Sequence, residues 1–169
     1  MTERPVVRMA RVEDAAAVQA IYAPIVEGTV ISFEDKAPSV EKIGRRIETT
    51  LAAFPYLVAE LDGKVVGFAY AGGHGKRRGY YRAANIGIYV AEEVRGAGVG
   101  KAIYGVLLPE LEARGIHTVM AAIVVPNDAS VRLHEGMGFV KAGVFREVGH
   151  KFGRYLDVGW WQLTFDGPA

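Results

Sequence analysis

A glycine-rich segment at residues 95–100 has the residue types and the spacing of an anion-binding turn. It reads Arg-Gly-Ala-Gly-Val-Gly and lies between a predicted strand at residues 85–90 and a long predicted helix that ends near Arg114. Glycine lets the backbone approach a ligand closely, and the first amides of a helix have no partner within that helix. Because the helix dipole also attracts negative charge, the segment predicts a site for a phosphate or a pyrophosphate.

Two common phosphate-binding motifs do not fit this segment. A P-loop needs G-x-x-x-x-G-K-[ST], but Gly100 and Lys101 are followed by Ala102, and the leading glycine is replaced by an arginine. A dinucleotide-binding fingerprint needs G-x-G-x-x-G, whereas this chain has G-x-G-x-G and no evident βαβ unit after it. A third pattern, R/Q-x-x-G-x-G/A between a strand and a helix, matches Arg95, Gly98 and Gly100 and is typical of loops that bind acetyl-coenzyme A.

The elements around this segment predict an α/β fold with a mixed sheet. Strands are predicted at residues 6–9, 56–61, 64–70, 85–90 and 119–125, with the last strands beginning at 139–140 and 143–145 and the sheet closing at 156–163. Helices with one apolar stripe are predicted near residues 15–27, 39–50, 100–114 and 128–135. Asp62 and Gly63 are typical of a hairpin turn, and Asp14 and Asn127 are expected to cap helices.

Length and composition exclude several classes of protein. The 169 residues contain no repeat or evident linker, so one domain over residues 1–169 is predicted. Lys and Arg number 20 against 19 Asp and Glu, which is too small a positive excess for a protein that coats nucleic acid. Without cysteine there is no disulfide, zinc ribbon or thiol nucleophile, and no metal site is predicted. The longest apolar run is far shorter than the roughly 20 residues that cross a bilayer, so we expect a cytoplasmic protein without a membrane partner.

The chain resembles the GNAT superfamily of N-acetyltransferases, in order along nearly its whole length. Besides residues 95–100, residues 126–139 are similar to the family's Asn-x-x-(helix)-x-x-Gly-Phe segment. Within the superfamily, residues 56–60, 69–72, 126–135 and 157–162 resemble the phosphinothricin acetyltransferase group, which also acylates methionine derivatives. The resemblance implies a mostly antiparallel sheet with helices on both faces, splayed near its centre to admit acetyl-CoA, and a homodimer.

The resemblance also implies the roles of the residues around the cofactor. The strand at residues 88–90 pairs with the pantetheine arm and polarises the thioester carbonyl, the glycine-rich segment holds the pyrophosphate, and Asn127 hydrogen-bonds the arm. The implied cofactor-binding residues are Ile88, Tyr89, Val90, Arg95, Gly96, Ala97, Gly98, Val99, Gly100, Lys101 and Asn127. The implied reaction is direct attack of an amine on the thioester, without a covalent enzyme intermediate.

Two residues are candidates for proton transfer. His134 stands where many GNAT enzymes carry a tyrosine that protonates the departing thiolate, although a packing role on its short helix fits equally well. Asn85 stands where relatives often have an acidic residue that helps to deprotonate the amine, and an amide cannot act as that base. Three alternatives follow: a water relay or another group serves as the base, the substrate needs little help, or Asn85 only satisfies backbone groups at a strand irregularity.

The missing carboxylate favours an acceptor amine that loses its proton easily. Removing the proton of an α-amine, with a pKa of about 7.7–8.0, costs roughly 0.5 kcal/mol at about pH 7.5, whereas a lysine amine near 10.4 costs about 4 kcal/mol. A positioned base contributes about 10²–10⁴ in rate. We therefore expect a free amino acid or a similar small amine as the acceptor.

A basic and aromatic loop at residues 76–82 and a segment after the first helix are candidates for the acceptor site. An arginine offers a two-pronged hydrogen-bond donor to a substrate carboxylate, although a solvated loop or an RNA contact are alternatives for this run. The candidate substrate-binding residues are Phe33, Glu34, Arg77, Arg78, Tyr81 and Arg82. A non-catalytic acyl-CoA-binding module is the alternative to an enzyme, because Asn85 is not a carboxylate.

Overall fold

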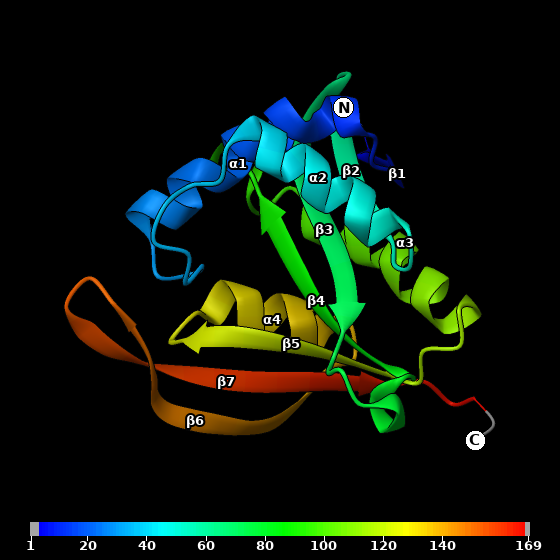
Figure 1. Cartoon of the computed structure of the whole chain (residues 1–169), viewed down its shortest axis with the longest axis vertical. Helices are drawn as coiled ribbons and strands as arrows, with labels where there is room; N and C mark the ends of the chain where they lie inside the picture. Colours follow the sequence, from blue (N-terminus) through cyan, green and yellow to red (C-terminus); the bar gives the residue numbers. More distant parts are fainter. Residues whose placement is uncertain (1–3, 168–169) are drawn as a thin grey trace.

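The computed structural model describes residues 4–167, which form a seven-stranded sheet with helices on both faces (Figure 1). The strands are β1 (Val6–Met9), β2 (Tyr56–Leu61), β3 (Lys64–Gly73), β4 (Ala83–Val90), β5 (Thr118–Val125), β6 (Val140–Lys151) and β7 (Arg154–Thr164). The helices are α1 (Ala15–Gly28), α2 (Val40–Leu51), α3 (Val99–Ala113) and α4 (Asp128–Gly136), with short 3-10 turns η1 (Val12–Asp14), η2 (Arg78–Tyr80) and η3 (Glu92–Val94). The predicted mixed α/β sheet is confirmed.

The sheet splits in its middle, between β4 and β5. The strand order is β1-β2-β3-β4-β5-β7-β6, and all neighbours are antiparallel except β4 and β5. These two parallel strands pair only between Ala83 and Asn85 of β4 and between Thr118 and Met120 of β5. Beyond Asn85 they diverge, and Figure 1 shows β3 and β4 crossing at an angle above β5, β7 and β6. The predicted central splay is therefore confirmed.

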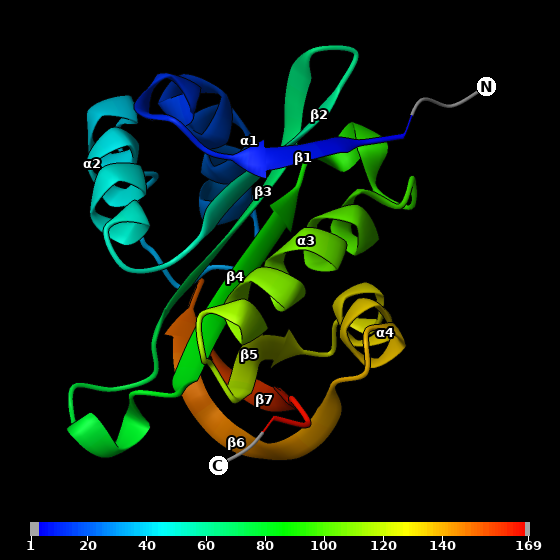
Figure 2. The same cartoon turned by 90° about the vertical axis from the view of Figure 1, so that its right-hand side faces the viewer.

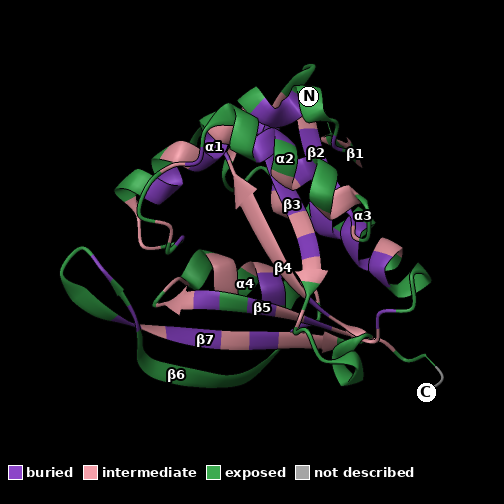
Figure 3. Ribbon diagram, in the orientation of Figure 1, coloured by how far each residue is buried: buried purple, intermediate pink, exposed green. Residues whose placement is uncertain are grey.

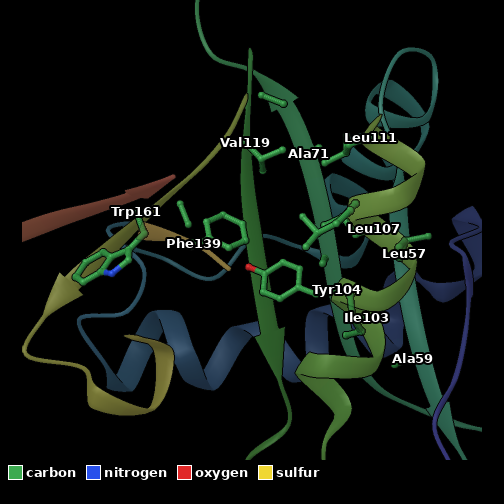
Figure 4. Close-up of a cluster of buried hydrophobic side chains, with 14 of the residues drawn as sticks. Leu57, Ala59, Ala71, Ile103, Tyr104, Leu107, Leu111, Val119, Phe139 and Trp161 are labelled. Carbon is green, nitrogen blue, oxygen red and sulfur yellow. The ribbon is translucent and has the colours of Figure 1, made fainter. Parts of the chain in front are cut away.

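The two faces of the sheet carry separate hydrophobic cores. Figure 2 shows α1 and α2 on one side of the sheet and α3 and α4 on the other. The core under α3 includes Tyr104 of α3, Phe139 from the connection between α4 and β6, and Trp161 of β7 (Figure 4). The core under α1 and α2 contains Tyr22 and Phe68, and the purple segments of Figure 3 follow both cores. Among residues 4–167, no helix has the length and hydropathy needed to cross a membrane.

Local signals in the sequence position the turns and caps as predicted. Asp62 and Gly63 have positive φ angles of 49° and 72°, which suit the tight turn between β2 and β3. The Asn127 side chain accepts a hydrogen bond from the Ser130 amide (3.2 Å) and caps α4. Gly115 adopts a φ of 82° after the end of α3.

Two predictions about local structure are wrong. The Asp14 carboxylate does not cap α1, because it binds the Arg8 guanidinium through two hydrogen bonds of 2.8 Å and also accepts from the Arg11 amide. The separate strands predicted to begin at residues 139–140 and 143–145 are instead one strand, because β6 runs without a break from Val140 to Lys151 and pairs along β7. Register shifts absorb the irregular positions, so long-range pairing overrides the local glycine signal.

Candidate active site

A cleft of about 530 Å³ lies beside β4, at the start of α3 and against α4. Its walls include all the predicted cofactor-binding residues except Ala97, together with Ser130, Leu133 and Ile25. The predicted residues among them are spread over forty positions of the sequence, from Ile88 to Asn127. The structure therefore gathers the predicted set into one concave surface, as ligand sites generally require.

The start of α3 presents unpaired backbone amides to this cleft. Gly96 and Gly98 adopt positive φ angles of 83° and 82°, with open space on the side where a Cβ would stand. Among the described residues, the amides of Val99, Gly100 and Lys101 have no hydrogen-bond acceptor, as expected for the first turn of a helix. The site therefore has the free donors and the open backbone that a pyrophosphate needs.

Close packing between α3 and α4 closes the cleft on its inner side. A Cβ on Gly100 would lie 2.9 Å from the Leu133 Cδ2 atom of α4, so a larger residue at this position would require the Leu133 side chain to shift. Gly100 thus allows close packing against Leu133, whereas Gly96 and Gly98 are favoured by their left-handed backbone conformation.

The outer half of β4 exposes backbone groups to the gap in the sheet. The Ala91 amide donates to the Val66 carbonyl of β3 (2.8 Å). In an antiparallel pair every second residue bonds the neighbouring strand, so Tyr89, Gly87 and Asn85 also turn their backbone groups toward β3. Ile88 and Val90 lie between them and turn their backbone groups toward β5, which has already separated from β4. The Ile88 amide therefore has no strand partner among the described residues and faces the gap.

The opposite face of β4 carries the candidate proton-transfer residue Asn85. Ile86 and Ile88 pack into the core under α3, so by alternation Asn85 lies on the face covered by α1 and α2. Its Oδ1 atom lies 2.9 Å from Nδ1 of His74, a residue just after β3. The His74 ring packs edge-to-face on Tyr80 and on Trp160, with centroid separations of 5.2 and 6.4 Å.

The other candidate, His134, is buried on the opposite face, with 2% of its surface exposed. Nδ1 lies 2.7 Å from the Ser130 carbonyl oxygen, which can only accept, so Nδ1 carries the proton. Nε2 then accepts from the Tyr104 hydroxyl at 2.6 Å. Burial lowers the pKa of His134, which keeps the ring neutral. This geometry favours the packing role, and the acid role stays a prediction.

The candidate acceptor residues Phe33 and Glu34 are engaged within the chain. The Phe33 ring lies so close to Gly149 that a Cβ there would come within 2.3 Å of it. The Glu34 carboxylate binds Arg46 through two hydrogen bonds of 2.5 and 3.0 Å, and this contact lowers the pKa of Glu34. The buried Lys151 ammonium donates to the carbonyl of Val26 in the last turn of α1 and to that of Ser32 in the following loop, which ties this loop to β6.

The four candidates in the basic loop do not converge on one point. Tyr81 is 73% exposed, and the Arg77 and Arg78 side chains are exposed with no partner among the described residues. Arg82 instead donates from Nε to the Gly115 carbonyl (3.0 Å), at the far end of α3. Arg77 and Arg78 thus remain available to a ligand, whereas Arg82 braces the loop.

A second cavity of about 400 Å³ lies on the α1 and α2 face of the sheet, and sequence reasoning missed it. It is lined by the rings of Tyr22, Tyr56 and Tyr70 and by basic side chains of α2, including Arg46. Burial raises the pKa of Tyr22 to about 12, so its hydroxyl stays protonated. The sequence also gave no role to His74, although a histidine in the loop that leads to Asn85 was a usable signal.

Comparison with known proteins identifies the family. Residues 7–160 match the acetyltransferase (GNAT) domain family. The chain is 38% identical over 167 residues to phosphinothricin N-acetyltransferase of Streptomyces viridochromogenes, covering 98% of this chain and 91% of that protein. It is 32% identical to the L-methionine sulfoximine/L-methionine sulfone acetyltransferase of Salmonella typhimurium, covering 96% of each.

A solved structure matches the whole architecture. The phosphinothricin acetyltransferase of Sinorhizobium meliloti, in complex with acetyl-CoA, superimposes with a TM-score of 0.91 at 32% identity, covering 97% of this chain and 89% of that one. The chain belongs to the GNAT acetyltransferase family. Enzymes of this family use acetyl-CoA, and the free amides of α3 and the split in the sheet fit that cofactor.

Proposed function

We propose that this enzyme transfers the acetyl group of acetyl-CoA to the amine of a small amino-acid-like acceptor, of the phosphinothricin, methionine sulfone or methionine sulfoximine type. One observation carries the proposal. The unpaired amides of α3 and the unpaired backbone of β4 line the same cleft. The first suits a pyrophosphate, and the second suits a thioester carbonyl. Relatives named for these acceptors support the substrate class.

The proposed reaction is a direct transfer between two bound substrates. The neutral amine attacks the thioester carbonyl carbon, an N–C bond forms, and the C–S bond breaks with release of the thiol. The Ile88 amide donates a hydrogen bond to the carbonyl oxygen as negative charge develops on it. Holding the amine and the thioester in line supplies much of the remaining acceleration.

The acceptor enters from the face of the sheet opposite α3 and α4. Arg77 and Arg78 are the exposed cations that would bind its carboxylate, because they have no partner among the described residues. Tyr70 and Tyr89, which pack together on this face with centroids 6.5 Å apart, form the apolar wall beside the gap. The residues Phe33 and Glu34 shape the loop over this wall through the contacts described above.

The alternative function is a non-catalytic module that binds acyl-CoA. Both proteins would bind acetyl-CoA through residues 95–101, so binding alone does not separate them. The enzyme alone releases free thiol when an amine is supplied. The proposal predicts that the basic loop does not bind nucleic acid. An oligonucleotide titration in low salt should therefore show no binding.

The deciding experiment is a thiol-release screen with acetyl-CoA. The acceptors are phosphinothricin, methionine sulfone, methionine sulfoximine, the common amino acids, a peptide with a free α-amine and a peptide whose amine is a lysine side chain. We expect release with the small amino-acid-like acceptors and little with the lysine peptide. Calorimetric binding of acetyl-CoA without thiol release from any acceptor would leave the non-catalytic alternative.

We further propose a cytoplasmic, single-domain homodimer. Support for the dimer comes from apolar side chains on the β6–β7 hairpin that face solvent, among them Phe145 (62% exposed) and Tyr155 (68% exposed). Light scattering should give twice the mass of the chain, and Phe145→Ser should shift the protein toward the monomer. A wild-type monomer at micromolar concentration contradicts this part of the proposal.

A further inference from the structure

We propose that His74 is the proton acceptor for the substrate amine, oriented by Asn85, in place of the carboxylate that the Asn85 position lacks. This inference rests on the proposed acetyl transfer and deepens it. It starts from the hydrogen bond between His74 Nδ1 and Asn85 Oδ1, at 2.9 Å. Both residues lie in the region where β4 leaves β5.

The hydrogen bond fixes the tautomer of the neutral ring. An amide oxygen has no proton to give, so Nδ1 of His74 is the donor. In a neutral imidazole the other nitrogen, Nε2, then carries the lone pair. Nε2 has no partner among the described residues, and it is not a buried orphan atom. It is therefore open to a water molecule or to a substrate.

The ring also lies on the side from which an acceptor must approach. His74 contacts Asn85 in β4 and Trp160 in β7, so it spans the two halves of the split sheet. Trp160 pairs with Ala122 of β5, beyond the last β4–β5 pair. Ile88 is three residues further along β4 than Asn85, about 10 Å at the usual rise of a strand. Proton transfer therefore runs through a water between the amine and Nε2.

The charges around the ring come from its own loop. Tyr80 is the titratable side chain packed on His74, while Asn85 and Trp160 bring no charge. The exposed cations Lys76, Arg77 and Arg78 follow in the same loop.

The proton balance is complete with this assignment. The ammonium form of the acceptor gives one proton through water to Nε2, and the neutral amine then attacks the thioester carbon. As the N–C bond forms and the C–S bond breaks, the nitrogen loses its second proton and the departing sulfur gains one. Nε2 later returns its proton to solvent, so one proton is released for each ammonium that is acetylated.

The test compares wild-type protein with His74→Phe, which keeps an aromatic ring between Tyr80 and Trp160. We expect kcat/KM for a methionine sulfone acceptor to fall by about 10²–10⁴ below the pKa of the acceptor amine. The loss should shrink as pH rises above that pKa, because the amine then needs no base. It should also be larger for acceptors of higher amine pKa, which a merely structural role would not produce. Affinity for acetyl-CoA, measured by calorimetry, should stay unchanged and serves as the folding control.

Two further variants keep the test decisive if His74→Phe does not fold. His74→Gln retains a hydrogen bond to Asn85 but takes no proton, so it should show the same pH-dependent loss. Asn85→Leu frees the ring and should reduce kcat/KM by a smaller factor with the same pH signature. If folded variants keep the wild-type rate and pH profile, the assignment of His74 is overturned while the acetyl transfer stands. If the wild-type protein releases no thiol with any acceptor, the proposed function itself fails.

Discussion

The two faces of the split sheet present different chemical groups to a ligand, backbone groups on one face and side chains on the other. On the side of α3 and α4, the site consists of backbone amides and glycines, and its one histidine, His134, is sealed between Tyr104 and the Ser130 carbonyl. On the side of α1 and α2, the site consists of side chains from distant segments, and its histidine, His74, has an open Nε2 atom. The first face suits a constant phosphate-bearing cofactor, and the second can vary with the acceptor.

Burial alone does not identify a histidine that is able to exchange protons with a substrate. His134 is the more buried ring and has its pKa lowered, yet both nitrogens are already paired within the protein. His74 is half-buried, and one of its nitrogens is paired with an uncharged amide. A proton carrier needs a free ring nitrogen, and of these two rings only His74 has a nitrogen without a partner among the described residues.

Apart from the variants of the two histidines, the largest effect is expected on acetyl-CoA affinity when the glycine-rich turn at residues 95–100 is changed. Gly98→Val places a β-branched residue at a φ of 82°, which costs about 2 kcal/mol of strain and weakens acetyl-CoA binding roughly thirtyfold. Calorimetry measures the affinity. Gly105→Ala, at a position of α3 with open space around it, is the matched control and should bind normally. Normal binding by Gly98→Val would show that the cofactor does not use this turn.

The sealed histidine is tested by His134→Phe. The variant leaves the buried Tyr104 hydroxyl without an acceptor, so the free energy of unfolding should fall by about 1–2 kcal/mol. At saturating substrates kcat should stay close to the wild-type value. The double variant with Tyr104→Phe should recover much of the stability, because both polar partners are removed. A large fall in kcat with stability retained would instead establish His134 as the proton donor to the departing sulfur.

As pH falls, the free energy of unfolding should decrease first through His134, on the α3 and α4 face of the sheet, and only at lower pH through Glu34, on the other face. Burial lowers the pKa of His134 below its ordinary value of 6.5, so the unfolded chain binds a proton that the folded chain resists. The contribution of His134 to the free energy of unfolding is therefore complete above pH 6.5 and is lost as pH falls below that value. The Arg46 contact lowers the pKa of Glu34 from 4.5, so that contribution is lost only at more acidic pH. Urea unfolding between pH 7.5 and 5 should show a decline that His134→Phe lacks.

The smallest effect is expected at the ion pair of the loop after α1. Glu34→Gln removes one charge of the pair with Arg46, whose side chains are 30% and 36% exposed, so the loss of stability should stay within about 1 kcal/mol. Glu41→Gln, which breaks the more exposed pair with Arg45 on α2, is the control and should change nothing measurable. Thermal unfolding measures both. A much larger loss in Glu34→Gln would mean that this loop is an essential part of the fold.

Features that depend on neighbouring residues were predictable from the sequence. The turn at Asp62 and Gly63, the cap from Asn127 and the glycine cradle after Arg95 each involve residues a few positions apart. The sheet class followed from them and from the order of the motifs, and the assignment of the cofactor site stays a prediction. Asp14 escaped prediction because its partner Arg8 competes with the helix amides, and nothing local sets which of the two prevails.

The order of residues along the chain was enough to predict the family, the acyl donor and the turn with free amides at the start of α3, because closely spaced glycines specify backbone donors at a helix start. Which side chains meet across the split in the sheet depends on the three-dimensional fold. Lys151 binds a carbonyl 125 positions away, and the strand register brings His74 onto Asn85. Such contacts depend on how strands pair and where they part, and residue order alone does not fix the distance between two side chains.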